Sequence, residues 1–261
     1  MAISTIDGVV AALPGQICPF TKASLTSVAG AYLSLWTAAG QPGAGAASAG
    51  STTTGAIPTS ATAGALSFTN PGSGNSYVGK AFASSSVQGT VVIYDRLWHG
   101  GAYTSASGSI SASTTTAVDR DSTGAGAELW VEIATALSAV ATTITVTYVN
   151  QAGTGSKTAT CAVPASAILG RMFPFVLAAG DTGIRQITAI SGSAAPTGTF
   201  NLVILRRLIE LPLSIAGVAA GGDFAYVGMP RVYDSACIGL FMNTNTTSTG
   251  TLSGSQNIIQ G

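Results

Sequence analysis

The chain has 261 residues, of which 46% are hydrophobic and only 8% are charged. This length allows one large or two ordinary domains, and the apolar fraction can build a substantial core, which excludes a disordered chain. Ten Lys and Arg balance ten Asp and Glu, so we expect no nucleic-acid partner and no membrane partner, because both need a basic surface. Ala, Gly, Ser and Thr supply more than half of the chain, and His99 is the single histidine. This composition disfavours enzymes, because few groups for acid–base or nucleophilic chemistry are present.

The apolar stretches and the cysteines indicate where the protein is made. The mean hydropathy of +0.45 raises the question of a membrane, but every apolar stretch is interrupted before the roughly 18 residues that a spanning helix needs. The N-terminus has no basic region before Asp7, so we expect no signal peptide. Cys18, Cys161 and Cys237 lie far apart without CxxC spacing. They predict buried, reduced thiols in a protein synthesised in a cytoplasm.

Three segments near the N-terminus differ in pattern. Residues 1–15 carry apolar residues at helical spacing before Pro14, which predicts an N-terminal arm with a short helix. The apolar positions of this arm are Ile3, Ile6, Val9, Val10 and Leu13. Residues 24–36 fit a short helix or a strand. Residues 40–64 are rich in Gly, Ala, Ser and Thr, and these side chains are too small to pack a core, so we expect an extended loop.

Beyond this loop, β-branched and aromatic segments are interrupted about every ten residues by Gly, Pro, Asn and Ser, which is typical of an all-β sandwich or barrel. The predicted strands are Ser76–Ala81, Gly89–Leu97, Glu128–Ala134, Thr142–Val149, Ser156–Val163, Gly183–Ser191, Phe200–Ile209, Phe224–Val227 and Arg231–Met242. We predict two β-sandwich or jelly-roll-like domains, residues 16–122 and 123–242, with extended terminal arms at 1–15 and 243–261. A polar, Gly-rich stretch at 122–126 marks the predicted boundary.

Two local patterns support these strands. Residues 142–149 alternate apolar and threonine side chains before a turn at 150–155, which predicts a hairpin with one core face and one threonine face. The segments GTVVIYDRL (89–97) and GTFNLVILRRL (198–208) resemble each other. They are either equivalent strands of two domains or a chance similarity caused by strand composition.

The tripeptide Asp181-Thr182-Gly183 is the aspartic-protease motif, in which one Asp shares a proton with a second Asp. The sequence contains one copy, preceded by the ordinary turn residues Ala-Ala-Gly. We therefore expect a β-turn here instead of a proteolytic centre.

Residues 119–124 resemble the start of an EF-hand calcium loop, with oxygen side chains at positions one, three and five and Gly at six. Position twelve is Trp130 instead of the bidentate Glu, and Arg120 stands among the ligands. We expect a solvated polar loop and no metal.

His99 follows an apolar strand and precedes Gly100 and Gly101. Neither a Gly-x-Ser-x-Gly elbow nor a neighbouring cysteine supports a catalytic triad, so a strand-end or interface histidine is expected. The Gly-rich runs contain neither GxGxxG nor a P-loop. We predict no catalytic residue, no cofactor and no metal site.

Adjacent charges interrupt two apolar strands, at Asp95-Arg96 and at Arg206-Arg207. Neighbours on a strand face opposite sides, so one member of each pair points toward the core or a subunit boundary and needs a charge partner. The candidate partners are Glu210, Asp234 and Asp95. Interfacial ion pairing is the favoured interpretation for Arg206 and Arg207, and edge-strand protection is the alternative.

Eight segments spread over most of the chain resemble a family of tailed-bacteriophage proteins encoded among the virion structural genes. The segments are LSLWTAAGQPGAGAA (33–47), LSFTNPGSGNSYVG (66–79), VVIYDRLWHGG (91–101), TVTYVNQAGTG (145–155), LAAGDTGIRQI (177–187), LVILRRLIELPL (202–213), PRVYDSACIGL (230–240) and STGTLSGSQNIIQG (248–261). The resemblance carries no catalytic or ligand residues. It implies a structural part of the phage particle, located in the virion after synthesis in the bacterial host cytoplasm.

The sequence narrows which part of the particle this is. The long amphipathic helix of a major capsid protein is missing, as are the repeats and heptads of a fibre. Compact β domains with arms fit a capsid decoration (cement) protein that bridges capsid subunits, with copies of itself, expected as a trimer, and the major capsid protein as partners. A tail-tube subunit is the main alternative. A carbohydrate-binding module that uses Trp36, Trp98 and Trp130 is a further one.

The predicted contacts to neighbouring chains lie mainly in the terminal arms. The N-terminal helix is too short to be stable alone in water and needs a surface to bury against. The uncharged C-terminal segment has the pattern of a strand that pairs with an edge of a neighbour. The predicted interface residues are Ile3, Ile6, Val9, Arg206, Arg207, Leu252, Ile258 and Ile259.

Overall fold

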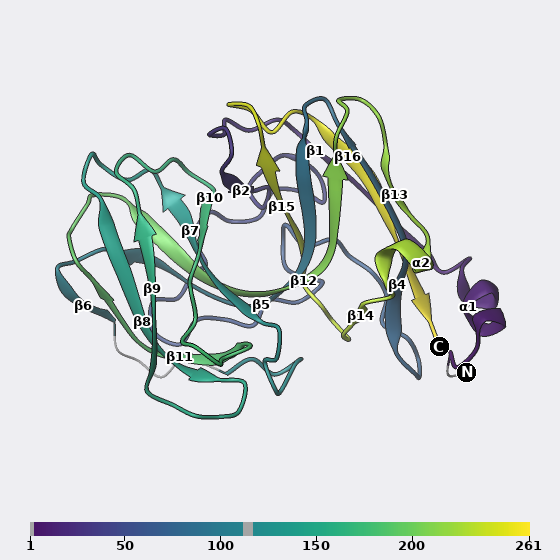
Figure 1. The fold of residues 1–261 in the computed structure, drawn as a ribbon, viewed down its shortest axis with the longest axis horizontal. Coiled ribbons are helices and arrows are strands. Elements are labelled where there is room, and N and C mark those ends of the chain that lie inside the picture. Colours follow the sequence, from purple (N-terminus) through teal and green to yellow (C-terminus); the bar gives the residue numbers. More distant parts are fainter. Residues whose placement is uncertain (1–2, 112–116) are drawn as a thin grey trace. The chain divides into compact units, whose positions relative to one another are not determined.

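The computed structural model describes residues 3–111 and 117–261 and is almost entirely β-structure (Figure 1), as the sequence predicts. The helices are α1 (Ile6–Ala12) and α2 (Phe224–Val227). The strands are β1 (Gln16–Lys22), β2 (Tyr32–Ser34), β3 (Gly40–Gln41), β4 (Ser76–Ser85), β5 (Gly89–Thr104), β6 (Gly108–Ser111), β7 (Glu128–Thr135), β8 (Thr142–Asn150), β9 (Lys157–Val163), β10 (Arg171–Pro174), β11 (Ile184–Gly192), β12 (Thr199–Leu213), β13 (Ala220–Gly222), β14 (Arg231–Val232), β15 (Ile238–Thr244) and β16 (Leu252–Gln260). Within the described residues, no helix has the length and apolar character that a membrane crossing requires.

The chain divides into two compact units whose boundaries differ from the predicted ones. Unit 1 comprises Met1–Gly45, Thr59–Asp95 and Arg207–Gly261, and unit 2 comprises Ala46–Pro58 and Arg96–Arg206. The predicted boundary at 122–126 therefore lies inside unit 2. The physical reason is that β5 and β12, the two strands that start with the similar Gly-Thr segments, are long hydrogen-bonded neighbours that contribute to both units.

Unit 1 is built from two β layers around one core. One layer is a six-stranded sheet in the order β13-β4-β16-β1-β3, with β14 paired to β4. The other contains β2, β15 and the unit 1 parts of β5 and β12. Inward residues of both layers form the core, for example Phe20, Val78, Ile93, Leu240 and Ile258.

Unit 2 has the same layered principle. Its four-stranded sheet runs β6-β11-β8-β9, and the unit 2 parts of β5 and β12 with β7 and β10 supply the other strands. In β8 and β9 the predicted hairpin is present, and the alternation places Ile144, Val146 and Tyr148 in the core. The threonine face lies opposite, as predicted.

The N-terminal helix α1 follows from its capping residues. The Gly8 amide donates to Thr5 Oγ1 at 3.1 Å, and Asp7 in the first turn complements the helix dipole. Val9 is buried, whereas Ile6 and Val10 are 71% and 53% exposed. The helix lies against β16 of its own unit.

The segment Phe224–Val227, predicted as a strand, forms the short helix α2. The Asp223 side chain accepts a hydrogen bond from the Ala225 amide, and Gly228 ends the turn in the left-handed conformation with φ of 71°. Local capping therefore overrides the β-propensity of the aromatic residues.

The C-terminal segment corrects the prediction of an extended arm. β16 pairs with both β1 and β4, so it is a central strand of the unit 1 sheet. Three of the predicted interface residues, Leu252, Ile258 and Ile259, are completely buried in the unit. The segment does add a strand by backbone pairing, but the edge that it meets belongs to the same chain.

Candidate functional site

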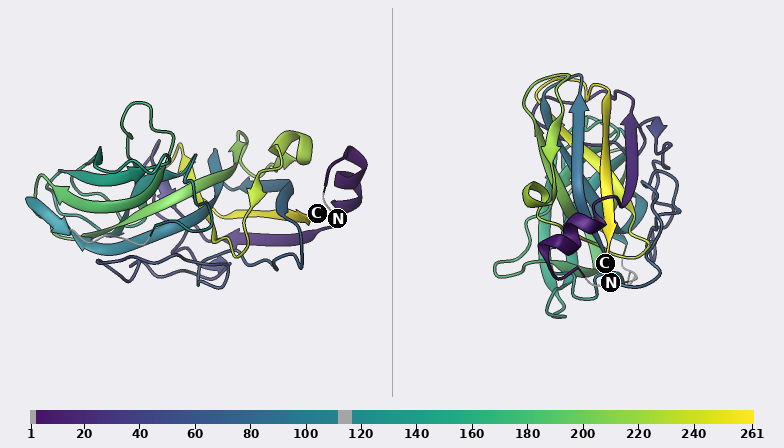
Figure 2. Two further views of the ribbon diagram at one scale, coloured as in Figure 1. Left: turned by 90° about the horizontal axis from the view of Figure 1, so that it is seen from below. Right: turned by 90° about the vertical axis from the view of Figure 1, so that its right-hand side faces the viewer.

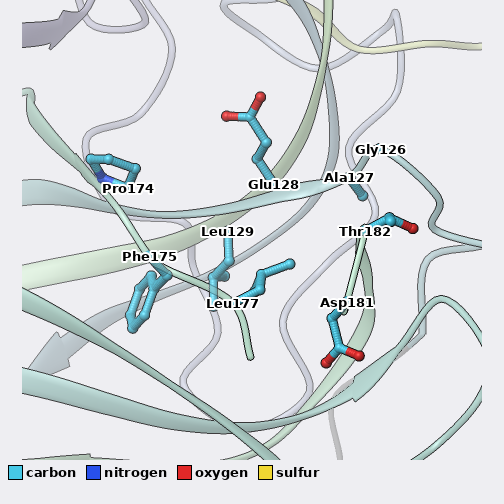
Figure 3. Close-up of a pocket in the computed structure, with 9 residues that line it drawn as sticks. All are labelled: Gly126, Ala127, Glu128, Leu129, Pro174, Phe175, Leu177, Asp181 and Thr182. Carbon is cyan, nitrogen blue, oxygen red and sulfur yellow. The ribbon is translucent and has the colours of Figure 1, made fainter. Parts of the chain in front are cut away.

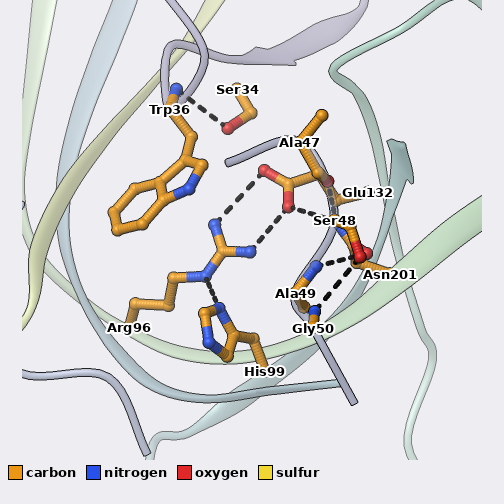
Figure 4. Close-up of polar contacts among 10 residues, drawn as sticks. All are labelled: Ser34, Trp36, Ala47, Ser48, Ala49, Gly50, Arg96, His99, Glu132 and Asn201. Atoms are coloured by element: carbon orange, nitrogen blue, oxygen red, sulfur yellow. Dashed lines mark hydrogen bonds and ion pairs between the residues drawn. The ribbon is translucent and has the colours of Figure 1, made fainter. Parts of the chain in front are cut away.

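A buried charged cluster lies in unit 2 (Figure 4). Its side chains are Arg96 and His99 on β5, Glu132 on β7 and Asn201 on β12. The four residues are 1%, 8%, 4% and 0% exposed, respectively. Burying ionised groups is costly unless they are paired and hydrogen-bonded, so the contacts inside this cluster decide what it can do.

The guanidinium of Arg96 is hydrogen-bonded on two sides, by Glu132 and by His99. Its Nη2 and Nη1 donate to Glu132 Oε2 and Oε1 at 2.7 and 3.3 Å, and its Nε donates to His99 Nδ1 at 3.0 Å. Asn201 Nδ2 adds a bond of 3.2 Å to Glu132 Oε2. The two-bond contact matches the planar guanidinium fork to the carboxylate, which is the favourable geometry for a buried pair.

His99 is held as a neutral hydrogen-bond acceptor. Burial and the nearby Arg96 charge lower the pKa of its imidazole to about 3, against the opposing effect of Glu132. The ring is therefore neutral near pH 7, and its Nδ1 lone pair accepts the Arg96 bond. His99 also lies inside β5, which continues to Thr104, and not at the strand end where the sequence pattern placed it.

The cluster holds residues 46–58, which we call the strap, on the strands of unit 2. Asn201 Nδ2 donates to the Ala47 carbonyl at 2.7 Å, and the Ala49 amide donates to Asn201 Oδ1 at 3.1 Å. His99 exchanges two backbone hydrogen bonds with Ala56, and the Gly101 amide donates to the Ser51 carbonyl at 2.7 Å. A side chain at Gly101 would collide with Asn201, so this close approach requires glycine.

Two further side chains extend the anchoring of the strap. Trp98 Nε1 donates to the Thr54 carbonyl at 3.2 Å, and Arg120 donates to the carbonyls of Pro58 and Arg96 at 2.6 and 2.7 Å. These hydrogen bonds, together with the packing of Ile57 against the core, hold the strap on the strands of unit 2.

Sequence reasoning found only part of this cluster. It identified Arg96 as a buried charge in need of a partner, but the partner is Glu132 instead of Glu210, Asp234 or Asp95. Asp95 instead accepts the Cys237 amide at 2.9 Å in unit 1. The available signal was Glu132 itself, a carboxylate in the middle of the apolar strand β7 (ELWVEIAT).

A surface pocket of about 420 Å³ lies elsewhere in unit 2 (Figure 3). Apolar residues such as Leu129 and Phe175 line it together with Glu128 and Asp181. Figure 3 shows these two carboxylates pointing in different directions. They do not form the facing pair that protease or glycosidase chemistry needs.

Asp181 has a local structural role. It accepts hydrogen bonds from Tyr148 Oη at 2.6 Å and Asn150 Nδ2 at 2.7 Å, and both bonds lower the pKa of its carboxyl. Burial and the bond to Asp181 raise the pKa of Tyr148 to about 12. The Asp181 amide donates to the Ala178 carbonyl at 3.0 Å, which closes the turn that the sequence predicts.

The loop that resembles a calcium site is organised by an arginine. Asp121 accepts hydrogen bonds from Thr123 Oγ1 at 2.9 Å and from Arg206 at 3.2 Å, while Asp119 is exposed. Within residues 3–111 and 117–261, no three His, Cys, Asp or Glu side chains are grouped so that they could hold a metal ion.

The remaining candidate residues are buried. Trp36, Trp98 and Trp130 are 3%, 0% and 0% exposed, so they are not available to stack on a sugar as the carbohydrate-binding alternative requires. Cys18, Cys161 and Cys237 are free and buried, as predicted.

The predicted interface residues have different surroundings. Ile6 is exposed and Ile3 half-buried, but Val9 is buried within its own chain. Arg206 pairs with Asp121 in unit 2, and Arg207 pairs with Glu210 at 3.0 Å in unit 1. Both arginines thus have partners within the chain. The pairing of β12 with β7 ends at Leu205, one residue before the two arginines, so edge protection stays an alternative for them.

Comparisons with known proteins give only weak structural similarities. No protein-family model matches the chain, and no curated protein matches it. Among solved structures, it is similar to the VP2 subviral particle of infectious bursal disease virus, with 14% identity over 95% of this chain and 80% of that chain and a TM-score of 0.20. For the Gt strain of the same virus, the identity is 13% over 94% and 81%, with a TM-score of 0.18.

Proposed function

We propose that this chain is a non-enzymatic structural component of a tailed-phage particle, where it acts as a capsid decoration protein that bridges neighbouring capsid subunits. Its partners would be further copies of itself, expected as a trimer, and the major capsid protein. The eight segments that resemble phage virion proteins point to the particle.

The observation that carries the proposal is the exposure of large apolar side chains on a chain with little charge. Val176, Ile6, Ile17, Ile215 and Tyr226 are between 55% and 79% exposed. Such side chains are tolerated where neighbouring subunits cover them. The charges of Arg96 and Glu132, in contrast, are buried and paired with each other inside unit 2.

Gold-labelled antibodies against the purified chain test this proposal on particles of the phage that encodes it, with pre-immune serum as the control. We expect label over the head. Label along the tail would contradict the decoration role and favour the tail-tube alternative. Unlabelled particles that also lack the chain on immunoblots would overturn a virion role.

The expectation that no metal is required has its own test. We expect the melting temperature to be the same with and without EDTA, because Asp121 is already bound by Thr123 and Arg206. A sharp fall of the melting temperature in EDTA would indicate a bound metal and contradict this expectation.

A further inference from the structure

The strap, residues 46–58, is attached to unit 2 mainly by hydrogen bonds. In the left-hand view of Figure 2 it runs as a loop along the lower side of the strands of unit 2. Ile57 and Pro58 at its C-terminal end are its only apolar side chains larger than alanine, and residues 46–56 are all Gly, Ala, Ser or Thr. Segments with few buried apolar contacts open at a lower free energy than the strands of a core. The strap therefore has the composition of a segment that opens locally.

The strap is attached at the buried charged cluster. The Asn201 side chain donates to the Ala47 carbonyl and accepts from the Ala49 amide, and Figure 4 shows both strap residues beside it. The backbone of His99 exchanges two hydrogen bonds with Ala56. Two residues of the cluster thus bind the strap, so a rearrangement of either one acts directly on its attachment.

The hydrogen bond between Arg96 and His99 depends on the protonation state of the imidazole. His99 Nδ1 accepts from Arg96 Nε at 3.0 Å, which requires an unprotonated nitrogen. Protonation removes this bond and places a second cation against the guanidinium. The other charged groups of the surroundings are the Glu132 carboxylate on β7 and Arg120, which donates to the Arg96 carbonyl. β12 contributes the neutral amide of Asn201, and the strap has no ionisable side chain.

The neighbours of a protonated His99 differ in how firmly they are held. Arg96 cannot move away without breaking its two hydrogen bonds to Glu132. The strap is neutral and lies against His99, which is 8% exposed. Its removal lets water reach the imidazole. Because water solvates a cation better than a protein interior does, the free energy of an imidazolium is lower with the strap detached.

We infer that the strap is an acid-sensitive segment: protonation of His99 detaches residues 46–56 from unit 2, while the strands beneath keep their pairing. Arg96 keeps its contact with Glu132 in the detached state. Detachment uncovers Trp98, because the strap lies so close to the indole ring that a Cβ at Gly55 would collide with it. The inference describes a conformational step of the isolated chain and does not rest on the proposed virion role.

Amide hydrogen exchange of the full chain, resolved to single residues, tests this inference between pH 7.5 and pH 4.5. The reporters are the amides of Ala49 and Ala56, which bond to Asn201 and His99. The references are the amides paired between β8 and β9. At each pH the measured rate is divided by the intrinsic rate of an unprotected amide. We expect the reporters to be at least about tenfold less protected than the references at both pH values, because the strap opens without the strands.

Acid should lower the protection of the reporters by up to about 100-fold. The pKa of His99 is about 3 with the strap in place against an ordinary 6.5, so each pH unit below 6.5 favours the detached form by up to about tenfold. Reporters as strongly protected as the references would overturn the inference, since the strap would then open only when the whole unit unfolds. Reporter protection that does not change with pH would also overturn it.

Two variants assign the effect to its proton. His99→Gln keeps an acceptor for Arg96 but cannot titrate, so its reporters should have the same protection at both pH values. Glu210→Gln removes an exposed carboxylate of unit 1 and is the matched control, which should keep the pH dependence of the wild type. Thermal melts check that both variants fold. A wild-type pH dependence in His99→Gln would overturn the role of His99, and none of these outcomes bears on the gold-labelling test.

Discussion

The two units bury positive charge in different ways. In unit 2, Arg96 meets the carboxylate of Glu132 and is surrounded by further polar side chains. In unit 1, Lys22 is 1% exposed, and its Nζ donates to the carbonyls of Ala38, Pro42 and Gly43 at 3.2, 2.8 and 3.5 Å. Burial lowers the pKa of Lys22 to about 8.

Both arrangements hold parts of the same small-residue stretch, which the sequence predicts as an extended loop at 40–64. Lys22 donates to carbonyls near its start, and Asn201 and Arg120 donate to carbonyls of the strap. A segment of Gly, Ala, Ser and Thr has little side-chain area to bury, so its order comes from long polar side chains of the strands that bind its backbone. The difference is electrostatic. In unit 2 the buried cation Arg96 is paired with the ionised carboxylate of Glu132, whereas in unit 1 the buried cation Lys22 is surrounded only by the dipoles of backbone carbonyls.

The largest expected effect comes from breaking the ion pair of unit 2. Glu132→Gln removes the carboxylate and leaves the Arg96 charge buried without its counter-ion, which should lower the free energy of unfolding by about 3–5 kcal/mol. Urea unfolding measures it. Glu210→Gln in the exposed Arg207 pair is the control and should cost at most about 1 kcal/mol. Equal losses for the two variants would show that the cluster is not the anchor described here.

Protonation of His99 in acid should lower the free energy of unfolding of the protein. Its pKa is about 3 in the folded chain against an ordinary value of 6.5, so the unfolded chain binds more protons between these pH values. The free energy of unfolding therefore falls as the pH drops from 6.5 to 3, by up to about 4 kcal/mol. His99→Gln keeps an acceptor for Arg96 but cannot titrate. Denaturant unfolding at several pH values should show a flatter profile for this variant, and parallel profiles would refute the assignment to His99.

Deprotonation of Lys22 in alkali should raise the free energy of unfolding. Its pKa is about 8 in the folded chain against 10.5 ordinarily, so the unfolded chain binds more protons in this window and the free energy of unfolding rises with pH. The rise attributable to Lys22 is at most about 3 kcal/mol. It is measured as the difference between wild type and Lys22→Met, so that the contributions of all other groups cancel. A difference that does not change between pH 7.5 and 10 would contradict the prediction.

The smallest effect should be stabilising. Gln256 is completely buried in unit 1, and its amide finds no hydrogen-bond partner among the described residues. Gln256→Met keeps the side-chain length and removes the unsatisfied groups, which should raise the free energy of unfolding by about 1–2 kcal/mol. The exposed Gln41→Met should change it by less than about 0.5 kcal/mol. A destabilised Gln256→Met would indicate that a buried water satisfies the amide.

Local pattern was sufficient for much of the fold. Strands are predicted near their observed positions by the alternation in 142–149 and by the apolar runs of β5, β7, β11 and β12. In a strand, successive side chains point to opposite faces, so the pattern of apolar residues shows which face of the segment is buried. β1 and β16 were missed, since Pro19 interrupts the first and small residues at 253–255 dilute the second. Their strand character depends on pairing with each other.

The sequence by itself determined the all-β class, the buried thiols and the absence of a recognisable catalytic motif, because these follow from composition and local spacing. Only the tertiary structure decided that the C-terminal segment is a central strand, that β5 and β12 belong to both units, and that Glu132 is the partner of Arg96. Each of these depends on which distant segments meet. A strand pattern states which side of a segment is apolar, but the hydrogen-bonding edges of all strands are chemically alike, so the choice of neighbour is made by the packing of the whole unit.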